Sequence, residues 1–528
     1  MNTIKKIMFG AAAALGISAC TNNFEEINTN PNKIGYGDIQ AYNCFEPILY
    51  GIGYQSQKLC QYYNNELIQM TAFTAGQTQQ VKEYQVTAGN WQTIWDNYAR
   101  YGGDCHHMIT LAKKWNDPYY EALGLILKVY NLSNLADLFG DIPYKEAYQY
   151  TENRTPVFES QAAVQDYLLA DLDTACVRLA AKPTISRSGL DLMYKDNFVK
   201  WIKLANSMKL RILCRYSGMN PDNWKKIQEM LDNPTKYPVM TSNADNAYVP
   251  FQAQDPYMSF WGQDKQTNKD FQNYRLTERV ISMMAELKDG KASFVDPRLT
   301  VFGKQGSKGW VGVVSGCPRN ENGAEDAKGP AYLDASLMNR ADFPGFIMDY
   351  SEVLFIAAEG VERGVLTISG QTAKSLYEAA LQANIDKWAE FGQNAETPKI
   401  VRAKDVKTLL ESSLASYDKA AAKDGTSIYE NALELILSQK WISLLYCGFE
   451  QYHEWRRTEY PVLTIGSGTA INDYELPTRL GYPNYTVTSN KQHVQEALAR
   501  MNGDNNMHTA LDWSYLKLNG QHRNPYNK

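Results

Sequence analysis

Apolar residues recur at steps of three and four along most of this chain, which is the spacing of one face of an α-helix. The clearest stretch, 118–139, carries apolar side chains on two opposite faces and is therefore predicted to pack between neighbouring helices. Asn116-Asp117-Pro118 separates it from a predicted helix over 90–115, and two helices joined by so short a turn form an antiparallel hairpin. Further helices are predicted over 42–70, 160–179, 197–216, 271–287, 350–360, 376–388, 428–446 and 492–501.

Helical periodicity fails in two long stretches, at about 233–270 and 296–346. The first is rich in proline and the second in glycine, and both contain several aromatic residues. Irregular stretches of this length in a compact domain are usually functional or disordered, and the aromatic content argues against disorder. The glycine spacing matches no phosphate-binding loop between a strand and a helix. We therefore expect an all-α protein with a helical domain over 41–528 that carries two long irregular loops.

The N-terminal residues have the layout of a secretory signal. Lys5 and Lys6 precede an apolar run over 7–17, which is too short to span a bilayer. Small residues stand directly before Cys20, and this arrangement resembles the lipobox of a bacterial lipoprotein. On this interpretation 1–19 is a signal peptide that is removed, Cys20 carries acyl chains, and 20–40 is a polar tether to a membrane. The alternative is an ordinary signal peptide followed by a chance cysteine.

The composition is that of a globular body with no further anchor. Of 528 residues 44% are apolar, the mean hydropathy is -0.45, and no second stretch is long enough for a membrane helix. The formal net charge of -5 argues against a broad phosphate-binding surface, so nucleic acid is not an expected partner. The cysteines after Cys20 are sparse and odd in number, so we expect mostly buried free thiols, although one or two disulfides can form.

Aromatic residues indicate a recognition surface. The chain has 35 Tyr and 11 Trp, whose rigid rings offer large faces with a polar edge. Sugars present C–H faces to such rings and hydroxyls to amide and carboxylate groups, and a rigid scaffold that displays long loops suits that task. The candidate ligand-binding residues are Tyr257, Trp261 and Trp310 in the irregular stretches, with Tyr84 and Trp91 from the first loop, a polar stretch at about 71–88 that leads into the predicted helix over 90–115. For each ring, a place in the core is an equally good interpretation.

Two pairs of carboxylates have the residue types of a catalytic site. Glu450 and Glu454 lie one helical turn apart, and such a pair could supply the acid and base of a glycoside hydrolase. Two arginines follow them at 456–457, so structural ion pairs explain these carboxylates better. The same interpretation applies to Asp137 and Asp141, and we expect no catalytic residue.

A short run, Asp104-Cys105-His106-His107, contains the residue types that ligate metals. Neighbouring residues of a helix point about 100° apart, and no second ligand pair follows one turn later. We therefore expect neither a metal site here nor a cofactor.

Six segments carry a pattern that is specific in combination: FEEINTNPN at 24–32, LADLFGDIPY at 135–144, DPRL at 296–299, YSEVLFIAAE at 350–359, WRRTEYP at 455–461 and LPTRLGYP at 476–483. In this order they resemble the SusD/RagB family of nutrient-binding outer-membrane lipoproteins of Bacteroidetes. One departure is NYT at 484–486, where relatives often carry an acidic residue before a downstream Asn.

The resemblance implies a SusD-like body of tetratricopeptide-type helix pairs, lipid-anchored at the outer membrane and facing the cell exterior. It also implies a partner, a SusC-like TonB-dependent transporter, to which the protein delivers an oligosaccharide or a peptide. Ligand contacts vary within the family, so no binding residue is carried over to this sequence.

The sequence leaves three functions open. The first is a non-catalytic lipoprotein that captures a nutrient. The second is a surface glycoside hydrolase of helical fold that uses Glu450 and Glu454. The third is a helical-repeat scaffold that binds no small ligand.

Overall fold

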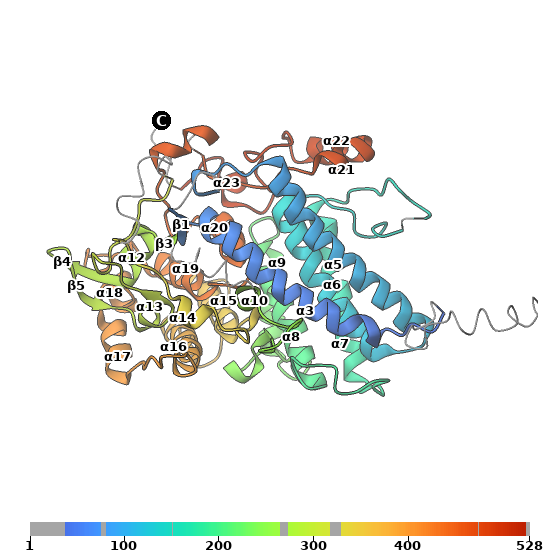
Figure 1. Cartoon of the computed structure of the whole chain (residues 1–528), viewed down its shortest axis with the longest axis horizontal. Helices are drawn as coiled ribbons and strands as arrows, with labels where there is room; N and C mark the ends of the chain where they lie inside the picture. Colours follow the sequence, from blue (N-terminus) through green and yellow to red (C-terminus); the bar gives the residue numbers. More distant parts are fainter. Residues whose placement is uncertain are drawn as a thin grey trace, which may run out of the picture.

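The structure, a computed structural model, describes residues 37–74, 81–149, 151–263, 273–316, 329–473 and 475–523. The expected signal peptide at 1–19, Cys20 and most of the tether lie outside the described residues. Helices dominate the described chain, which confirms the expected all-α fold (Figure 1). No described helix combines the length and the apolar character needed to cross a bilayer.

Four long helices pack in sequence order to form one side of the molecule (Figure 1). They are α5 (Ala88–Lys114), α6 (Pro118–Phe139), α7 (Gln161–Ala180) and α8 (Phe198–Arg215), and each packs against the next. α6 is buried on nearly all faces, as its apolar pattern predicts. Each helix begins where a polar side chain accepts a hydrogen bond from a backbone N–H of the first turn, with Thr87, Asp117, Ser160 and Asn197 as caps.

A second group of helices surrounds α15 (Tyr350–Glu362), which packs against α16 (Ala373–Gln393), α19 (Ala432–Ser443) and α8. α20 (Glu450–Thr458) follows α19 and packs on it. The shorter helices are α9 (Asp222–Asp232), α10 (Phe260–Gln263), α12 (Glu278–Met284), α13 (Pro297–Phe302), α14 (Ala335–Met338), α17 (Ala403–Glu411), α18 (Tyr417–Ala422), α21 (Asn484–Ser489), α22 (Lys491–Arg500) and α23 (Tyr515–Asn519), with 3-10 turns at Val81–Glu83, Asn243–Asp245 and Ser467–Asn472.

α3 (Tyr42–Leu59) joins the two groups, because it packs against α5 on one side and against β8 (Gly345–Met348) on the other. It continues through a π-helical turn (Cys60–Asn64) into α4 (Asn65–Leu67). The predicted helix over 42–70 is therefore present, with a local widening near its end.

The chain just before α3 is fixed to the end of α5. Lys114 Nζ donates a hydrogen bond to the carbonyl of Gly37 at 3.1 Å, and Trp115 Nε1 donates one to the carbonyl of Ile39 at 3.0 Å. The first described residues therefore have a defined attachment point on the helical body.

Short antiparallel strands line the second group of helices. One sheet has the order β1-β3-β7-β6, and two strand pairs, β2 with β8 and β4 with β5, stand apart from it. The remaining strands are β1 (Thr71–Phe73), β2 (Ala247–Val249), β3 (Tyr274–Leu276), β4 (Ala285–Lys288), β5 (Lys291–Val295), β6 (Gly303–Lys304) and β7 (Tyr332–Leu333). Most of these strands fall in or beside the irregular stretches at 233–270 and 296–346.

The predicted helix over 271–287 is wrong in its extent. The structure forms β3 first, begins α12 after the cap Thr277, and leaves the helix for β4 at Ala285. β4 and β5 form a hairpin closed by Asp289 and Gly290, both with positive φ, which is the backbone that an Asp-Gly turn adopts. Helical spacing of apolar residues masked this turn signal. The helices that lie outside the predicted ranges are α9, α10, α13, α14, α17, α18, α20, α21 and α23.

A cluster of buried charges connects α8 with three other helices. Arg211 Nε and Nη2 lie 2.7 and 2.5 Å from the carboxylate oxygens of Glu352 on α15, and Arg211 Nη1 lies 3.2 Å from Glu450 on α20. Arg215 bonds the other oxygen of Glu450 and also Asp137 on α6. Because every side chain in this cluster is nearly inaccessible to solvent, each charge depends on its partners for compensation.

A second buried cluster connects α15, α19 and α20. Arg457 holds both oxygens of Glu359, at 2.7 and 2.6 Å, and lies 2.5 Å from Glu454. Lys440 lies 3.0 Å from the other oxygen of Glu454. The two clusters share α15 and α20, so they fix the first group of helices against the second.

Replacing Glu450 with Gln should lower the free energy of unfolding by about 3–5 kcal/mol, because two buried arginines then lose a shared counter-charge. Urea denaturation followed by circular dichroism measures the effect. Glu411→Gln is the matched control, since that carboxylate is 67% exposed and lies 3.8 Å from Lys407. The control should unfold like the wild type. Equal midpoints for the two variants would show that the buried cluster does not stabilise the fold.

Candidate functional site

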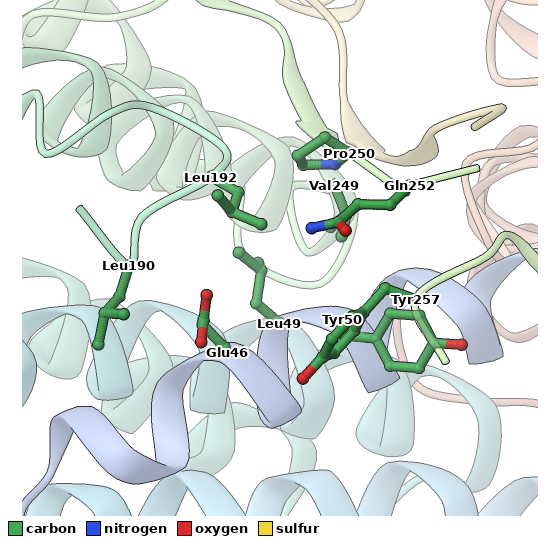
Figure 2. A pocket seen from close by; sticks show the side chains of 9 residues that line it. All are labelled: Glu46, Leu49, Tyr50, Leu190, Leu192, Val249, Pro250, Gln252 and Tyr257. Carbon is green, nitrogen blue, oxygen red and sulfur yellow. The ribbon is translucent and has the colours of Figure 1, made fainter. Parts of the chain in front are cut away.

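A pocket with two tyrosine rings on one wall opens beside α3 (Figure 2). Tyr50 comes from α3 and Tyr257 from the loop after β2, and their ring centroids are 5.5 Å apart with the ring planes at 87°. Tyr257 is 42% exposed. The other lining residues are Glu46, Leu49, Leu190, Leu192, Val249, Pro250 and Gln252.

The position of this loop depends on Tyr50. Its hydroxyl donates a hydrogen bond to the carbonyl of Met258 at 3.1 Å, and its ring contacts Phe251 edge to face at 5.6 Å between centroids. The backbone N–H of Gln252 donates to the carbonyl of Tyr257 at 2.8 Å, which closes the loop on itself. The Tyr257 ring is therefore held at the mouth of the pocket by its contact with Tyr50 and by the hydrogen-bonded backbone of its own loop.

The pocket can take one edge of a ligand and not a whole oligosaccharide. Its volume is about 80 Å³, below the range of enclosed small-molecule sites. The exposed face of Tyr257 offers a stacking surface, while Glu46 and Gln252 supply a carboxylate and an amide for hydroxyl or amine groups. This combination of an open ring with adjacent polar groups suits a sugar or a peptide side chain.

The tryptophans predicted beside Tyr257 lie in the core. Trp261 is fully buried and packs edge to face against Phe343 and Tyr446, with centroids 5.7 and 5.0 Å away. Trp310 is 7% exposed and lies over Gly303, where a Cβ atom would sit 3.2 Å from the indole ring. Direct ligand binding by these two residues stays a prediction, and in this conformation their rings contribute packing.

Tyr84 and Trp91, the candidates from the first loop, also lie apart from the pocket. Tyr84 is fully buried and accepts a hydrogen bond from Gln69, and burial raises the pKa of its hydroxyl. Trp91 is partly buried and lies against Gly481, where any Cβ atom would sit 2.4 Å from the ring. Ligand binding by either residue also stays a prediction.

Glu450 and Glu454 lie in the buried charge clusters and not in a pocket mouth. Burial raises the pKa of Glu454, but Arg457 and Lys440 outweigh it, so this pKa lies below its usual value. A general acid of a glycoside hydrolase needs the opposite, a raised pKa. Asp137 pairs with Arg215, and Asp141 lies 2.7 Å from Arg500. The structural interpretation therefore fits all four carboxylates.

The run at 104–107 lies within α5, and its side chains do not converge. Among the described residues no group of three or more His, Cys, Asp and Glu side chains is arranged to hold a metal ion. Cys105 is buried, which raises the pKa of its thiol. The described cysteines are free thiols, of which Cys60, Cys105, Cys214 and Cys447 are buried and Cys44 and Cys176 are partly buried. Cys317 lies outside the described residues.

Most of the pocket was missed by sequence reasoning, which found only Tyr257. Glu46 and Tyr50 are one helical turn apart on α3, and that spacing is a signal that they share a face. Nothing local connects them to Leu190 or Gln252, which reach the pocket only through the tertiary fold.

Comparison with known proteins identifies similar chains over nearly the whole length. A family model described as "Starch-binding associating with outer membrane" (SusD-like) matches residues 31–483. A search of curated protein sequences returns no match.

Among solved structures, a chitin-binding protein superposes with a TM-score of 0.71 at 23% identity, covering 90% of this chain and 99% of the other. A SusD homologue from Parabacteroides distasonis superposes with a TM-score of 0.73 at 22% identity, covering 89% of this chain and 98% of the other. A SusD homologue from Bacteroides fragilis superposes with a TM-score of 0.71 at 24% identity, covering 90% of this chain and 99% of the other. These similarities establish the fold.

Replacing Trp261 with Ala should lower the free energy of unfolding by about 3–5 kcal/mol even without ligand, because it empties a packed aromatic site. Tyr257→Ala should lower it by less than about 1 kcal/mol, because that ring is half exposed. Thermal and urea unfolding of the two variants provide the measurement. If Trp261→Ala were as stable as the wild type, its packing role would be refuted.

Proposed function

The chain belongs to the SusD-like family of outer-membrane-associated nutrient-binding proteins, and on that premise we propose that it captures an oligosaccharide and delivers it to a SusC-like TonB-dependent transporter. In this proposal acyl chains on Cys20 anchor the protein in the outer membrane, with its body facing the cell exterior. A peptide is the alternative ligand. Capture without catalysis is the function that the family and the geometry support together.

The observation that carries the proposal is the family match over residues 31–483, whose description names both starch binding and the outer membrane. The similar fold of a chitin-binding protein supports glycans as the ligand class and makes chitin oligosaccharides a reasonable probe beside starch oligosaccharides. The buried ion pairs of Glu450 and Glu454 favour binding over hydrolysis.

Within this function we assign the ligand contact to the pocket of Tyr50 and Tyr257. Tyr257 presents an exposed ring that is already held in place, so binding requires little further ordering of the loop. Glu46 and Gln252 lie beside it and would bind hydroxyl groups at the ring edge. A longer ligand would extend from this pocket over the surface.

Tyr257→Ala should weaken binding of a starch or chitin oligosaccharide by about threefold to tenfold, because a stacking face is lost. Calorimetric titration of the mature chain measures this. Tyr485→Ala is the matched control, a tyrosine 46% exposed that lines a different groove, and it should bind like the wild type. Unchanged affinity in Tyr257→Ala would discard this site. A chain that bound nothing on a glycan and peptide array would favour a scaffold role.

Anchoring and partnership are tested in the native membrane. The wild-type chain should fractionate with the outer membrane and co-purify with a TonB-dependent transporter, while Cys20→Ala should leave the membrane fraction because it cannot be acylated. Fractionation and mass spectrometry of the co-purified proteins provide the readout. Unchanged membrane attachment of Cys20→Ala would contradict a lipid anchor at this residue.

A further inference from the structure

A larger groove is lined by residues of α5, α6, the loop segments 143–149 and 151–158, and α21. α5 and α6 belong to the side of the molecule formed by the first four helices (Figure 1). The volume of the groove is about 510 Å³, within the range of small-molecule sites. It shares no lining residue with the pocket of Tyr50 and Tyr257. Its lining is mostly apolar, with a few polar groups at the rim.

The floor of the groove is a rigid aromatic cluster around Trp95 of α5. The Trp95 ring packs edge to face on Phe139 and Tyr482, with centroids 5.0 and 5.9 Å away, and stacks at 6.4 Å on Phe158. Phe158 and Trp95 both line the groove. Trp95 is 7% exposed and Phe158 is 2% exposed, so these rings form a rigid backing to the groove. The lining ring that is open to a flat apolar group is that of Tyr485, which is 46% exposed.

The rim is held in place by its own hydrogen bonds. Asn490 Nδ2 donates to the carbonyl of Pro156 at 2.7 Å, which ties the loop segment 151–158 to the end of α21. Asn153 Nδ2 donates to Glu146 at 2.8 Å, and the hydroxyl of Tyr485 donates to Asp96 at 2.7 Å. Glu146 and Asp96 are therefore engaged by neutral rim groups.

Among the described residues that line the groove, Arg154 alone is charged. It is exposed, and no ion pair or hydrogen bond joins its guanidinium to another described residue. The described lining residues include no carboxylate that would neutralise it. A ligand with an anionic end would therefore meet a guanidinium whose hydrogen-bond donors are available.

We propose that this groove binds a small molecule that combines an aryl group with a carboxylate, the ring lying against Tyr485 over the Trp95 backing and the carboxylate bonding Arg154. The proposal goes beyond nutrient capture at Tyr257 and does not depend on it. The same chemistry occurs in free arylalkanoic acids and in the C-terminal aromatic residue of a short peptide, so each source needs its own probe.

Binding of 3-phenylpropanoate and of acetyl-Gly-Phe to the mature chain is measured by calorimetric titration, with the neutral amide of each compound as a comparison. At least one carboxylate should bind saturably and more tightly than its amide. Arg154→Gln should weaken the binding of that carboxylate by about fivefold to tenfold and leave the binding of its amide unchanged. Ala99→Leu, which fills the groove from α5 with a good helix former, should abolish binding of both forms.

Arg100→Gln is the matched control. It also removes one arginine charge, at the position after Ala99 on α5, where the side chain is 73% exposed and lies outside the groove. It should bind like the wild type. Absence of saturable binding by both carboxylates would overturn the proposal. So would equal affinities for carboxylate and amide, an unchanged affinity in Arg154→Gln, or binding that survives Ala99→Leu.

Discussion

The architecture depends on charges that are buried only because they meet several partners at once. Arg211 and Arg215 of α8 need carboxylates from α6, α15 and α20 together, since a single missing partner leaves an uncompensated ion in the interior. Arg457 imposes the same condition on α15 and α20, and Lys440 connects α19 to this cluster through Glu454. Apolar packing alone would tolerate small shifts between the helix groups, whereas hydrogen-bonded ion pairs specify one arrangement.

This use of charge separates the structural from the functional polar groups. The glutamates that have the spacing of a catalytic pair stabilise the interior, and most of the tryptophans that could stack on a sugar fill it. In both proposals recognition falls to side chains at the edges of the helical body, Tyr257 in one and Arg154 in the other. Both lie on loops that are tied to helices by hydrogen bonds, so they are exposed and yet well positioned.

The helices were largely predictable because periodicity and caps agree. Asp117, for example, caps α6 and Pro118 is its first residue, and the sequence pattern predicted the start of a helix at this place. The helix predicted over 271–287 failed because apolar spacing was given more weight than the Asp289-Gly290 turn. The predicted irregular stretches contain short helices, such as α13, and short strands that pair with partners far along the chain, as β2 does with β8. Such long-range pairing cannot be inferred from local sequence.

The candidate site was the least predictable part. Composition shows that rings are abundant, but the side to which each ring points depends on which neighbours cover it. Trp261 and Tyr257 are four residues apart, and one is enclosed by Phe343 and Tyr446 while the other is open. The pocket also draws on Glu46 and Leu190, residues that only the folded chain brings together.

The attachment of residues 37–39 to the end of α5 has a mechanical consequence. If the chain is anchored at Cys20, a thermal force on the tether acts first on the hydrogen bonds that Lys114 and Trp115 donate. The force then acts on α5 and α6, which are packed against each other over most of their length. It does not pull the N-terminal end of α3 away from its neighbours. Because Glu46 and Tyr50 belong to α3, this attachment would keep the pocket in the same shape while the body moves on its tether.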